Sequence, residues 1–579
     1  MHDPQAGQLQ KLLGDVYPAD SPGDLAELSS HLLQSSWQPS GKRDTHQASP
    51  LWSGADAVLI TYADTVVDGD APGLRSLRKL VNAHLAEFSA VIHVLPFLKS
   101  TSDGGFAVAS YEQLEERHGD WNDLSALAEG RRLMADLVLN HVSASHPWVR
   151  QFLRHEDPGQ SCVLEAAPDP CWNDVVRPRS TALFTQLGPP NAKRQVWTTF
   201  GPDQVDLNWR SPEVLIGFAE LLRRMTRHGV RWIRLDAVGF IWKEPNTTCI
   251  HRPEAYRLVQ VLRLLLQSLC PDGVVVTETN VPEQENLSYL RNGQEAHLAY
   301  NFPLPPLLLE AAISGRADLL NSWLSHWPQL PETTGLLNFT ACHDGVGLRP
   351  LEGLMPDRRL LQFLIACEQR GGLISHRRLS SGDDVPYEIN ISWWSAMADG
   401  GIDPSHLQLE RFLLTQLLVM ALPGVPGFYL PALLASPNDV SKFRRTGQRR
   451  DLNRPQFKTD SLDRRLDDPE SAPTLVLQVL RHAMRVRGLM QALHPDTPMT
   501  LMSEGRSDLV VLKRGIDQQV VYAVHNMTSA RLNFPLSTLT DKAALSSWHD
   551  ALLERDLEIG QQQLQLQLEP YQVAWLVSR

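Results

Sequence analysis

The chain has 579 residues, which is too long for one compact core, so we expect a large domain with smaller additions at one or both ends. Hydrophobic residues make up 42% and charged residues 21%, which is typical of a folded globular protein and argues against extensive disorder. The formal net charge of -12 gives no basic surface for nucleic acid or for an anionic membrane. Neither is therefore expected as a partner.

Three features of the sequence predict a cytoplasmic protein. The six cysteines are scattered, with no CxxC pair and no metal-ligand spacing. The N-terminal residues MHDPQAGQLQ do not form a basic stretch followed by an apolar one, so no secretory signal is expected. The most apolar stretch, Phe412 to Leu430, is interrupted by Gln416, Pro423 and Pro426, which predicts a buried helix leading into a strand and no membrane span.

Residues 1–50 have helix-like apolar spacing and predict a small N-terminal helical extension. From residue 51 to 492, short apolar runs alternate with amphipathic helical segments, some ending at a glycine such as Gly229 or Gly371. The candidate strands are 57–64, 90–97, 133–141, 230–238, 273–280, 296–302, 335–344 and 424–430. Eight such units predict a catalytic (β/α)8 TIM barrel in preference to an open, doubly wound sheet.

Two further regions depart from the alternating pattern. The stretch from about 143 to 208 is too long for a simple connection and is rich in Pro and Asp, so we expect a small inserted domain after the third strand. Residues 493–579 contain short alternating runs separated by turn residues, which predicts a C-terminal antiparallel β domain resembling a sandwich.

Polar residues gather where the candidate strands end, which is where barrel enzymes carry their chemistry. Asp136, Asn140 and His141 follow the third strand, Arg234 and Asp236 the fourth, Glu278 the fifth, and His343 and Asp344 the seventh. Any one of these carboxylates could be an ordinary salt-bridged or capping residue. Together they match retaining glycoside transfer, which needs a carboxylate nucleophile and a carboxylic acid about 5 to 5.5 Å apart.

The two main carboxylates are predicted to have different roles. Arg234 stands two residues before Asp236, so both side chains point the same way from the strand and the guanidinium can keep the carboxylate ionised, as a nucleophile requires. Glu278 has no comparably placed cation in the sequence, so a less polar setting could keep it protonated as the acid.

The segments DLVLNH, VRWIRLDAVGF, VVTETN and FTACHDGVG resemble, in order and spacing, the four sequence regions of the α-amylase family, glycoside hydrolase family 13. The resemblance implies that Asp236 is the nucleophile, Glu278 the acid/base and Asp344 the third carboxylate, which binds sugar hydroxyls. It also places His141, Arg234 and His343 around the glucosyl ring.

The motifs LITYAD, HVLPF, SDGGF, RPRSTALFT, VWTTFGPDQVDLN and RRDLNR resemble those of the sucrose phosphorylase subfamily. By matched motif, Asp103 and Arg454 would bind the far end of the donor glucose and Phe106 would stack on its ring. Gln204 would lie near the acceptor side. The resemblance also implies that Arg179 contacts phosphate and that Tyr387 lies in a mobile loop which rearranges between acceptor and phosphate binding.

The departures from that subfamily lie on the acceptor side. They are Phe240, Asn280, Val385 and Glu388. Together with WKEPNTTCIH, TETNVP, PYEIN and HDGVGLRPLEG, they resemble the glucosylglycerate phosphorylase branch, which implies cleavage of 2-O-α-glucosyl-glycerate by phosphate with retention. The alternatives are a phosphorylase of sucrose, sucrose 6-phosphate or glucosylglycerol, an α-glucosidase-type hydrolase, and an inactive barrel used for binding.

An anionic acceptor requires a cation, and the loops after the catalytic strands offer Arg349 and Lys243. Arg349 is the stronger candidate because a guanidinium can hold a carboxylate by two parallel hydrogen bonds. The basic run that ends at Arg450 is interpreted as a solvated loop. We expect inorganic phosphate and a small α-glucoside as partners, no cofactor, no metal (with Asn140 in a structural hydrogen bond), and a monomer or homodimer.

Overall fold

The computed structural model describes residues 4–33, 50–379, 383–399, 407–516, 519–539, 547–557 and 565–578. Its centre is a closed barrel of eight parallel strands in the order β1-β16-β12-β11-β10-β9-β4-β3. The strands are β1 Val58–Thr61, β3 Val91–Val94, β4 Arg132–Val138, β9 Val230–Asp236, β10 Val274–Thr277, β11 Leu298–Tyr300, β12 Gly335–Phe339 and β16 Val425–Tyr429. Each coincides with one of the eight predicted runs, apart from β4, which begins one residue earlier, and this confirms the barrel.

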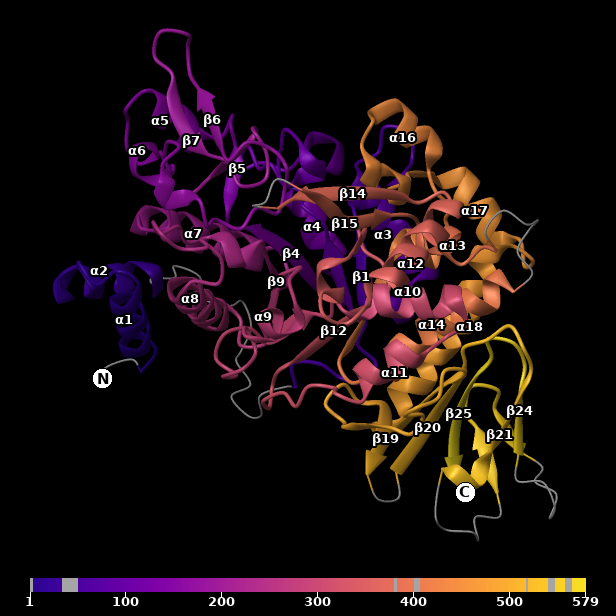
Figure 1. Cartoon of the computed structure of the whole chain (residues 1–579). Helices are drawn as coiled ribbons and strands as arrows, with labels where there is room; N and C mark the ends of the chain where they lie inside the picture. The colour runs from indigo at the N-terminus through magenta and orange to yellow at the C-terminus, as the bar shows by residue number, and fades with distance from the viewer. Residues whose placement is uncertain are drawn as a thin grey trace.

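The barrel strands are near-continuous apolar runs, and strands such as β1, β3 and β16 are buried throughout, as expected of a parallel sheet covered by helices. Val58 in β1 lies opposite Val91 in β3 and opposite Gly427 in β16, so the first and last strands pair directly. Helices surround the strands (Figure 1). They include α3 Gly73–His84, α4 Trp121–Leu127, α7 Pro212–Arg227, α8 Pro253–Leu269, α9 Glu283–Leu287, α10 Leu304–Ser314, α11 Asp318–Leu324, α12 Asp357–Gln369, α14 Gln408–Ala421 and α18 Ala472–Leu489.

Predicted helix ends agree with the structure. Helix α7 ends at Arg227, and Gly229 follows with φ of +91°, a conformation that glycine adopts without strain. The apolar stretch from Phe412 forms the buried helix α14, which leads into strand β16. Among the described residues, no helix combines the length and the apolar character that crossing a membrane requires.

The segment between β4 and α7 rises above the barrel as a separate group of elements (Figure 1). It contains β5 His141–Ser143, α5 Pro147–Leu153, α6 Gly159–Cys162, β6 Phe184–Leu187, β7 Arg194–Trp197 and β8 Gln204–Asp206. Strand β5 pairs with β8, which returns the chain to the barrel, and β6 pairs with β7. The expected insertion after the third barrel strand is therefore present.

Two other loops over the barrel carry structure of their own. After β12, strands β13 Val346–Gly347, β14 Leu373–Arg378 and β15 Asp384–Asn390 form a sheet in the order β13-β15-β14. After β16, helices α15 Leu430–Leu433 and α16 Val440–Thr446 lead to a short 3-10 helix, Arg449–Asn453. These segments lie above the same end of the barrel as the insertion (Figure 1).

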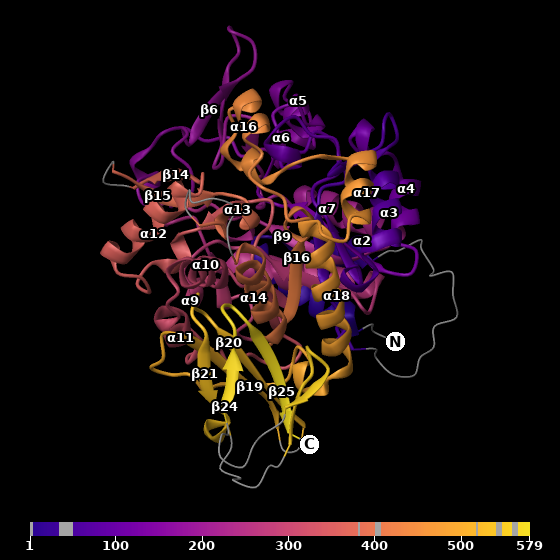
Figure 2. The same ribbon diagram turned by 90° about the vertical axis from the view of Figure 1, so that its right-hand side faces the viewer.

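The two ends of the chain add smaller elements. Helices α1 Pro4–Val16 and α2 Pro22–Leu33 pack on each other and on α8, where Arg257 pairs with Asp15 at 3.3 Å. The C-terminal part is an antiparallel sheet, β18-β19-β20-β25-β22-β23, with the pair β21-β24 beside it (Figure 2). Its strands are β18 Met499–Leu501, β19 Leu509–Ile516, β20 Gln519–Asn526, β21 Leu532–Pro535, β22 Trp548–Asp550, β23 Arg555–Leu557, β24 Gln565–Leu568 and β25 Val573–Ser578. A separate apolar cluster that includes Trp548, Phe534 and Leu566 lies within these strands.

Candidate active site

A cavity opens at the carboxyl ends of the barrel strands, where the predicted site residues meet. The predicted residues that line it are Asp103, Phe106, His141, Arg179, Gln204, Arg234, Asp236, Glu278, Asn280, His343, Asp344, Arg349, Tyr387 and Glu388. Two others that the sequence suggested, Lys243 and Arg454, are not among the described residues that line it. Arg450, which the sequence did not suggest, does line it.

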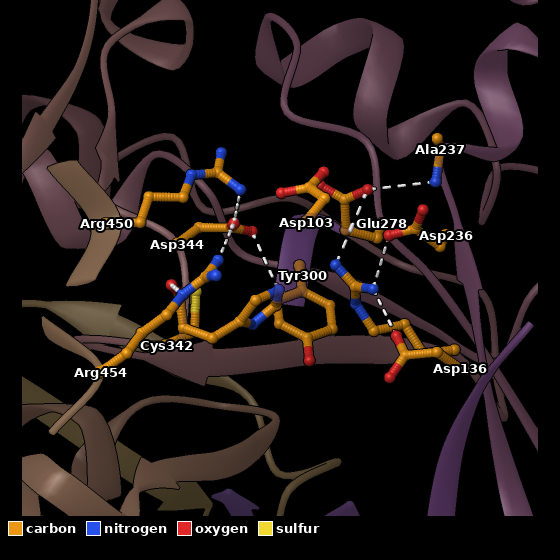
Figure 3. A network of polar contacts seen from close by, with 12 residues as sticks. Asp103, Asp136, Asp236, Ala237, Glu278, Tyr300, Cys342, Asp344, Arg450 and Arg454 are labelled. Carbon is orange, nitrogen blue, oxygen red and sulfur yellow. Dashed lines mark hydrogen bonds and ion pairs between the residues drawn. The ribbon is translucent and has the colours of Figure 1, made fainter. Parts of the chain in front are cut away.

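The buried guanidinium of Arg234 is shared by three carboxylates from neighbouring strands. It donates to Asp236 at 2.7 Å, pairs with Asp136, and lies 3.8 Å from Glu278 (Figure 3). Arg234 therefore also approaches Glu278, but from a greater distance than it lies from Asp236. The two carboxylates differ in that Arg234 bonds directly to Asp236 and only approaches Glu278.

Burial dominates the protonation of these two groups. It raises the pKa of the Asp236 carboxyl well above its usual range, and Arg234 opposes that rise. Burial also raises the pKa of the Glu278 carboxyl, again against Arg234. The expectation that Arg234 would hold Asp236 ionised by itself thus omitted the larger effect. Since the two carboxyls share one cavity, we expect them to share a proton, with the direct bond to Arg234 favouring the charge on Asp236.

The backbone after Asp236 also contributes to the site. Ala237 has φ of +51° and ψ of +29°, a left-handed conformation that is unusual for a residue with a side chain. Its N–H donates to Oε2 of Glu278 at 3.2 Å (Figure 3). The turn therefore ties the loop after β9 to the carboxylate that follows β10. Such strain persists where the surrounding structure enforces it.

Asp136 keeps its charge below the cavity. His93 lies with Nε2 at 2.8 Å from Asp136, and both side chains are fully buried. Burial alone would raise the pKa of Asp136, but His93 and Arg234 lower it to about 2. An ionised Asp136 offsets part of the charge of Arg234 and fixes its orientation toward Asp236.

Asp344 lies on the other side of the cavity and is surrounded by cations. Arg450 pairs with its Oδ1, Arg454 lies 3.9 Å away, and Nε2 of His343 is 3.5 Å from Oδ2 (Figure 3). Burial would raise the pKa of Asp344, but Arg450, His343 and Arg454 hold it well below its usual range. The ligand atoms of Cys342, His343 and Asp344 lie within 4.8 Å of one another, yet the two arginines disfavour a cation there.

The interpretation of the basic run as a solvated loop is wrong for Arg450. The 3-10 helix Arg449–Asn453 turns this side chain inward, where it also bonds Glu388 at 3.1 and 2.7 Å. The sequence signal was the motif RRDLNR, which spans both Arg450 and Arg454. A run of charges alone does not reveal which member points inward.

The expected donor side is a compact group of polar and aromatic side chains. Nε2 of Gln204 lies 3.1 Å from Asp103 and 3.0 Å from Nε2 of His141. Phe106 stacks on His343 with ring centroids 5.1 Å apart. Gln204, expected near the acceptor side, therefore bonds to two residues expected to hold the donor glucose.

Arg454 lies behind this group. Its Nε donates to the carbonyl of His343 at 2.8 Å, and its guanidinium lies 5.6 Å from the centre of the Tyr62 ring. With Tyr62 and Gly104 it lines a neighbouring cavity. Its contact with Asp344 places it next to the expected donor site but outside the lining of the main cavity.

Arg349, Asn280 and His251 line another part of the cavity. Nε of Arg349 lies 3.8 Å from Glu352, whose carboxylate is held more closely by Arg377 at 2.9 Å. The Arg349 side chain is only 12% exposed, and its Nε is buried without a hydrogen bond among the described residues. Burial and then the charge of Arg349 lower the pKa of His251 to about 4. Arg349 thus presents to the cavity a charge that Glu352, itself held by Arg377, offsets only in part.

Tyr387 lies in strand β15, within the loop that passes over the barrel after β12, and the expected rearrangement of this loop stays a prediction. Ser375 of β14 pairs with Glu388 and His376 with Pro386, so Tyr387 is the extra residue of a β-bulge. A bulge redirects a side chain, and Tyr387 lines the cavity together with Arg179. Burial raises the pKa of the Tyr387 hydroxyl while the nearby Arg179 lowers it. This hydroxyl is therefore neutral and available for hydrogen bonding.

Lys243 is paired with buried groups and does not line the cavity. Its ammonium group lies 2.6 Å from Asp206 and 2.5 Å from Oδ1 of Asn140, and it also donates to the carbonyl of Phe240. The side chain is 4% exposed. The expectation that Lys243 binds an acceptor is therefore wrong, because its charge is neutralised inside the protein. Asn140 takes part in this structural bond, as expected.

The comparisons agree with this geometry. A family model for the catalytic domain of alpha amylase matches residues 84–343. The crystal structure of sucrose 6F-phosphate phosphorylase from Thermoanaerobacter thermosaccharolyticum has the same fold, with a TM-score of 0.70 over 83% of this chain and 94% of that one, at 23% identity. The fold, the match and the carboxylate cluster define the class as the α-amylase family.

More similar sequences narrow the class. A glucosylglycerate phosphorylase of Allomeiothermus silvanus is 36% identical over 91% of this chain and 92% of its own length. Another from Escherichia coli is 32% identical over 92% of this chain and 93% of its own length. The chain therefore belongs to the glucosylglycerate phosphorylase family.

Proposed function

We propose that this chain cleaves 2-O-α-glucosyl-glycerate with inorganic phosphate to give α-glucose 1-phosphate and glycerate, with retention at the anomeric carbon. The family supports the reaction. The observation that carries the proposal is the combination, in one cavity, of the Asp236 and Glu278 carboxyls with two arginines, Arg179 and Arg349. The nearest carboxylate to Arg349, Glu352 at 3.8 Å, lies closer to Arg377. Two anions, phosphate and glycerate, must enter this site, and two cations are present to receive them.

In the first step, Asp236 attacks the anomeric carbon and the bond to the glycerate oxygen breaks. Glu278 gives its proton to that oxygen, so glycerate leaves as an alcohol. Burial of Glu278 favours the protonated form that this step requires. Asp344, kept ionised by Arg450 and its neighbours, accepts hydrogen bonds from glucose hydroxyls and stabilises the positive charge that develops on the ring.

In the second step, a phosphate oxygen attacks the glucosyl ester of Asp236 from the side that glycerate left, and Asp236 becomes the leaving group. Glu278, now ionised, takes the proton from phosphate. Arg179 and the Tyr387 hydroxyl line the cavity and bind the phosphate oxygens in this scheme. Two inversions give net retention.

Incubation with phosphate and a panel of α-glucosides tests the proposal. The panel contains glucosylglycerate, sucrose, sucrose 6-phosphate and glucosylglycerol, and the products are α-glucose 1-phosphate and the released acceptor. We expect glucosylglycerate to give the highest kcat/KM and glucose 1-phosphate to form only with phosphate. Equal glucose release with and without phosphate would establish a hydrolase instead, and preference for another glucoside would reassign the acceptor.

We further propose that the enzyme works in the cytoplasm as a monomer or homodimer, with boundaries near residues 50 and 492 and an insertion at about 143–208. The six cysteines are free thiols, five of them buried, which suits a reducing compartment. Sedimentation velocity would test the assembly, and limited proteolysis would test the boundaries.

A further inference from the structure

Arg450 links two parts of the site that come from different loops. It lies in the 3-10 helix after β16, and its Nε and Nη2 hold both oxygens of Glu388 in strand β15. Its Nη1 pairs with Asp344 after β12. One planar guanidinium therefore makes a bidentate bond to one carboxylate and a further bond to another, which fixes its orientation.

Glu388 is built to hold this arginine. Its side chain is 2% exposed, and its backbone pairs with Gly347 in β13. Gly345 leaves room for it, because a Cβ atom there would lie 2.5 Å from Cγ of Glu388 and 2.6 Å from the carbonyl oxygen of Ile389. The chain after Asp344 thus passes directly against the carboxylate that fixes Arg450.

We propose that Arg450 is a positioning residue, held by Glu388, that fixes the orientation and the negative charge of Asp344 for glucosyl transfer. This inference rests on the proposed function only in assuming that Asp344 acts on a glucosyl group, and it does not depend on the identity of the acceptor. It also connects the phosphate side to the donor side, because Glu388 is the neighbour of Tyr387 in β15.

The charged and titratable groups around Asp344 set the direction of the pH effect. They are Arg450, Arg454, Arg234, His343, Glu278, Asp103, Glu388, Tyr62, Tyr429 and Cys342. Arg450 is the cation that lowers the pKa of Asp344 most. Without it, Asp344 would take up a proton at a higher pH, so activity would be lost at a higher pH on the acid side.

The test measures kcat/KM against pH with α-glucosyl fluoride as donor, which needs no protonated Glu278 to release its leaving group and no glycerate. We expect Arg450→Gln to lower kcat/KM about 30- to 4000-fold, as for truncation of one member of a buried charge pair, and to move the acid limb to higher pH. Arg450→Lys should restore the acid limb in part, because it keeps a charge without the fork. Arg444→Gln, an exposed member of the same basic run, is the matched control and should equal wild type.

Glu388→Gln and the double variant Glu388→Gln/Arg450→Gln complete the test. If Glu388 acts through Arg450, the double variant should be no slower than Arg450→Gln alone. Independent, multiplying losses would overturn the role of Glu388. An Arg450→Gln enzyme that only melts earlier, with the wild-type acid limb and kcat/KM below its melting range, would overturn the proposal for Arg450. Because fluoride replaces glycerate, these outcomes do not depend on the identity of the natural acceptor.

Discussion

The acceptor assignment makes a sharp prediction for Arg349→Ala. The side chain is 12% exposed, and its nearest carboxylate, Glu352 at 3.8 Å, is already held by Arg377. A carboxylate of glycerate would therefore meet a largely desolvated and only partly compensated guanidinium. Loss of such a contact costs about 2 to 5 kcal/mol. At about 1.4 kcal/mol for each factor of ten, the preference for glycerate over glycerol should fall roughly 30- to 4000-fold.

The assay is synthesis from α-glucose 1-phosphate with glycerate or glycerol as acceptor, comparing kcat/KM for the two. We expect wild type to prefer glycerate strongly and Arg349→Ala to lose that preference while keeping its KM for glucose 1-phosphate. Arg349→Lys should be intermediate, and Arg358→Ala, an exposed arginine at the start of α12, should behave as wild type. Equal use of glycerol and glycerate by wild type, or an unchanged preference in Arg349→Ala, would refute the reasoning.

Four further changes test other parts of the site. Asp236→Asn should abolish turnover because an amide cannot form the glucosyl ester, while calorimetry should still detect sugar binding; a near-native rate would remove Asp236 from the mechanism. Glu278→Gln should slow release of glycerate most, so that mass spectrometry detects a glucosyl adduct with α-glucosyl fluoride, whereas failure to trap any adduct counts against double displacement. Arg179→Ala should raise the KM for phosphate well beyond any change in the KM for glucosylglycerate; equal changes in both would deny it a phosphate contact. Lys243→Met should leave Asp206 as a buried, unpaired charge and lower the free energy of unfolding by about 3 to 5 kcal/mol, measured as a lower Tm. The acceptor preference should not change. A changed preference in a stable variant would restore Lys243 to the acceptor site.

The barrel was predictable because its strands are buried on both faces. Strands of this kind have short apolar sequences. Their alternation with amphipathic helices is compatible with few folds other than a barrel. The end of each run then locates the side chains that face the cavity, which is why Asp236, Glu278 and Asp344 could be assigned to one site. The conformation of Ala237 could not be predicted, since nothing in an alanine marks a left-handed turn.

The rest of the site depends on contacts between distant segments. Lys243 and Arg349 both follow catalytic strands, yet one is neutralised by Asp206 of the insertion and the other is not. Arg450 looked like one member of an exposed basic run until the loop after β16 brought it to Asp344. The sequence shows which residues are charged, whereas the tertiary fold determines whether an oppositely charged group neutralises them.

The bond between Lys243 and Asp206 bears on how this scaffold can be re-engineered. It joins the loop after β9 to the end of β8, and Asn140 adds the end of β4, so three segments share one buried ammonium group. A chimera that exchanges only the insertion for that of another barrel enzyme would leave this ammonium without its carboxylate. Productive exchange requires all three segments to be moved together, as a single cassette with its own internal charge balance.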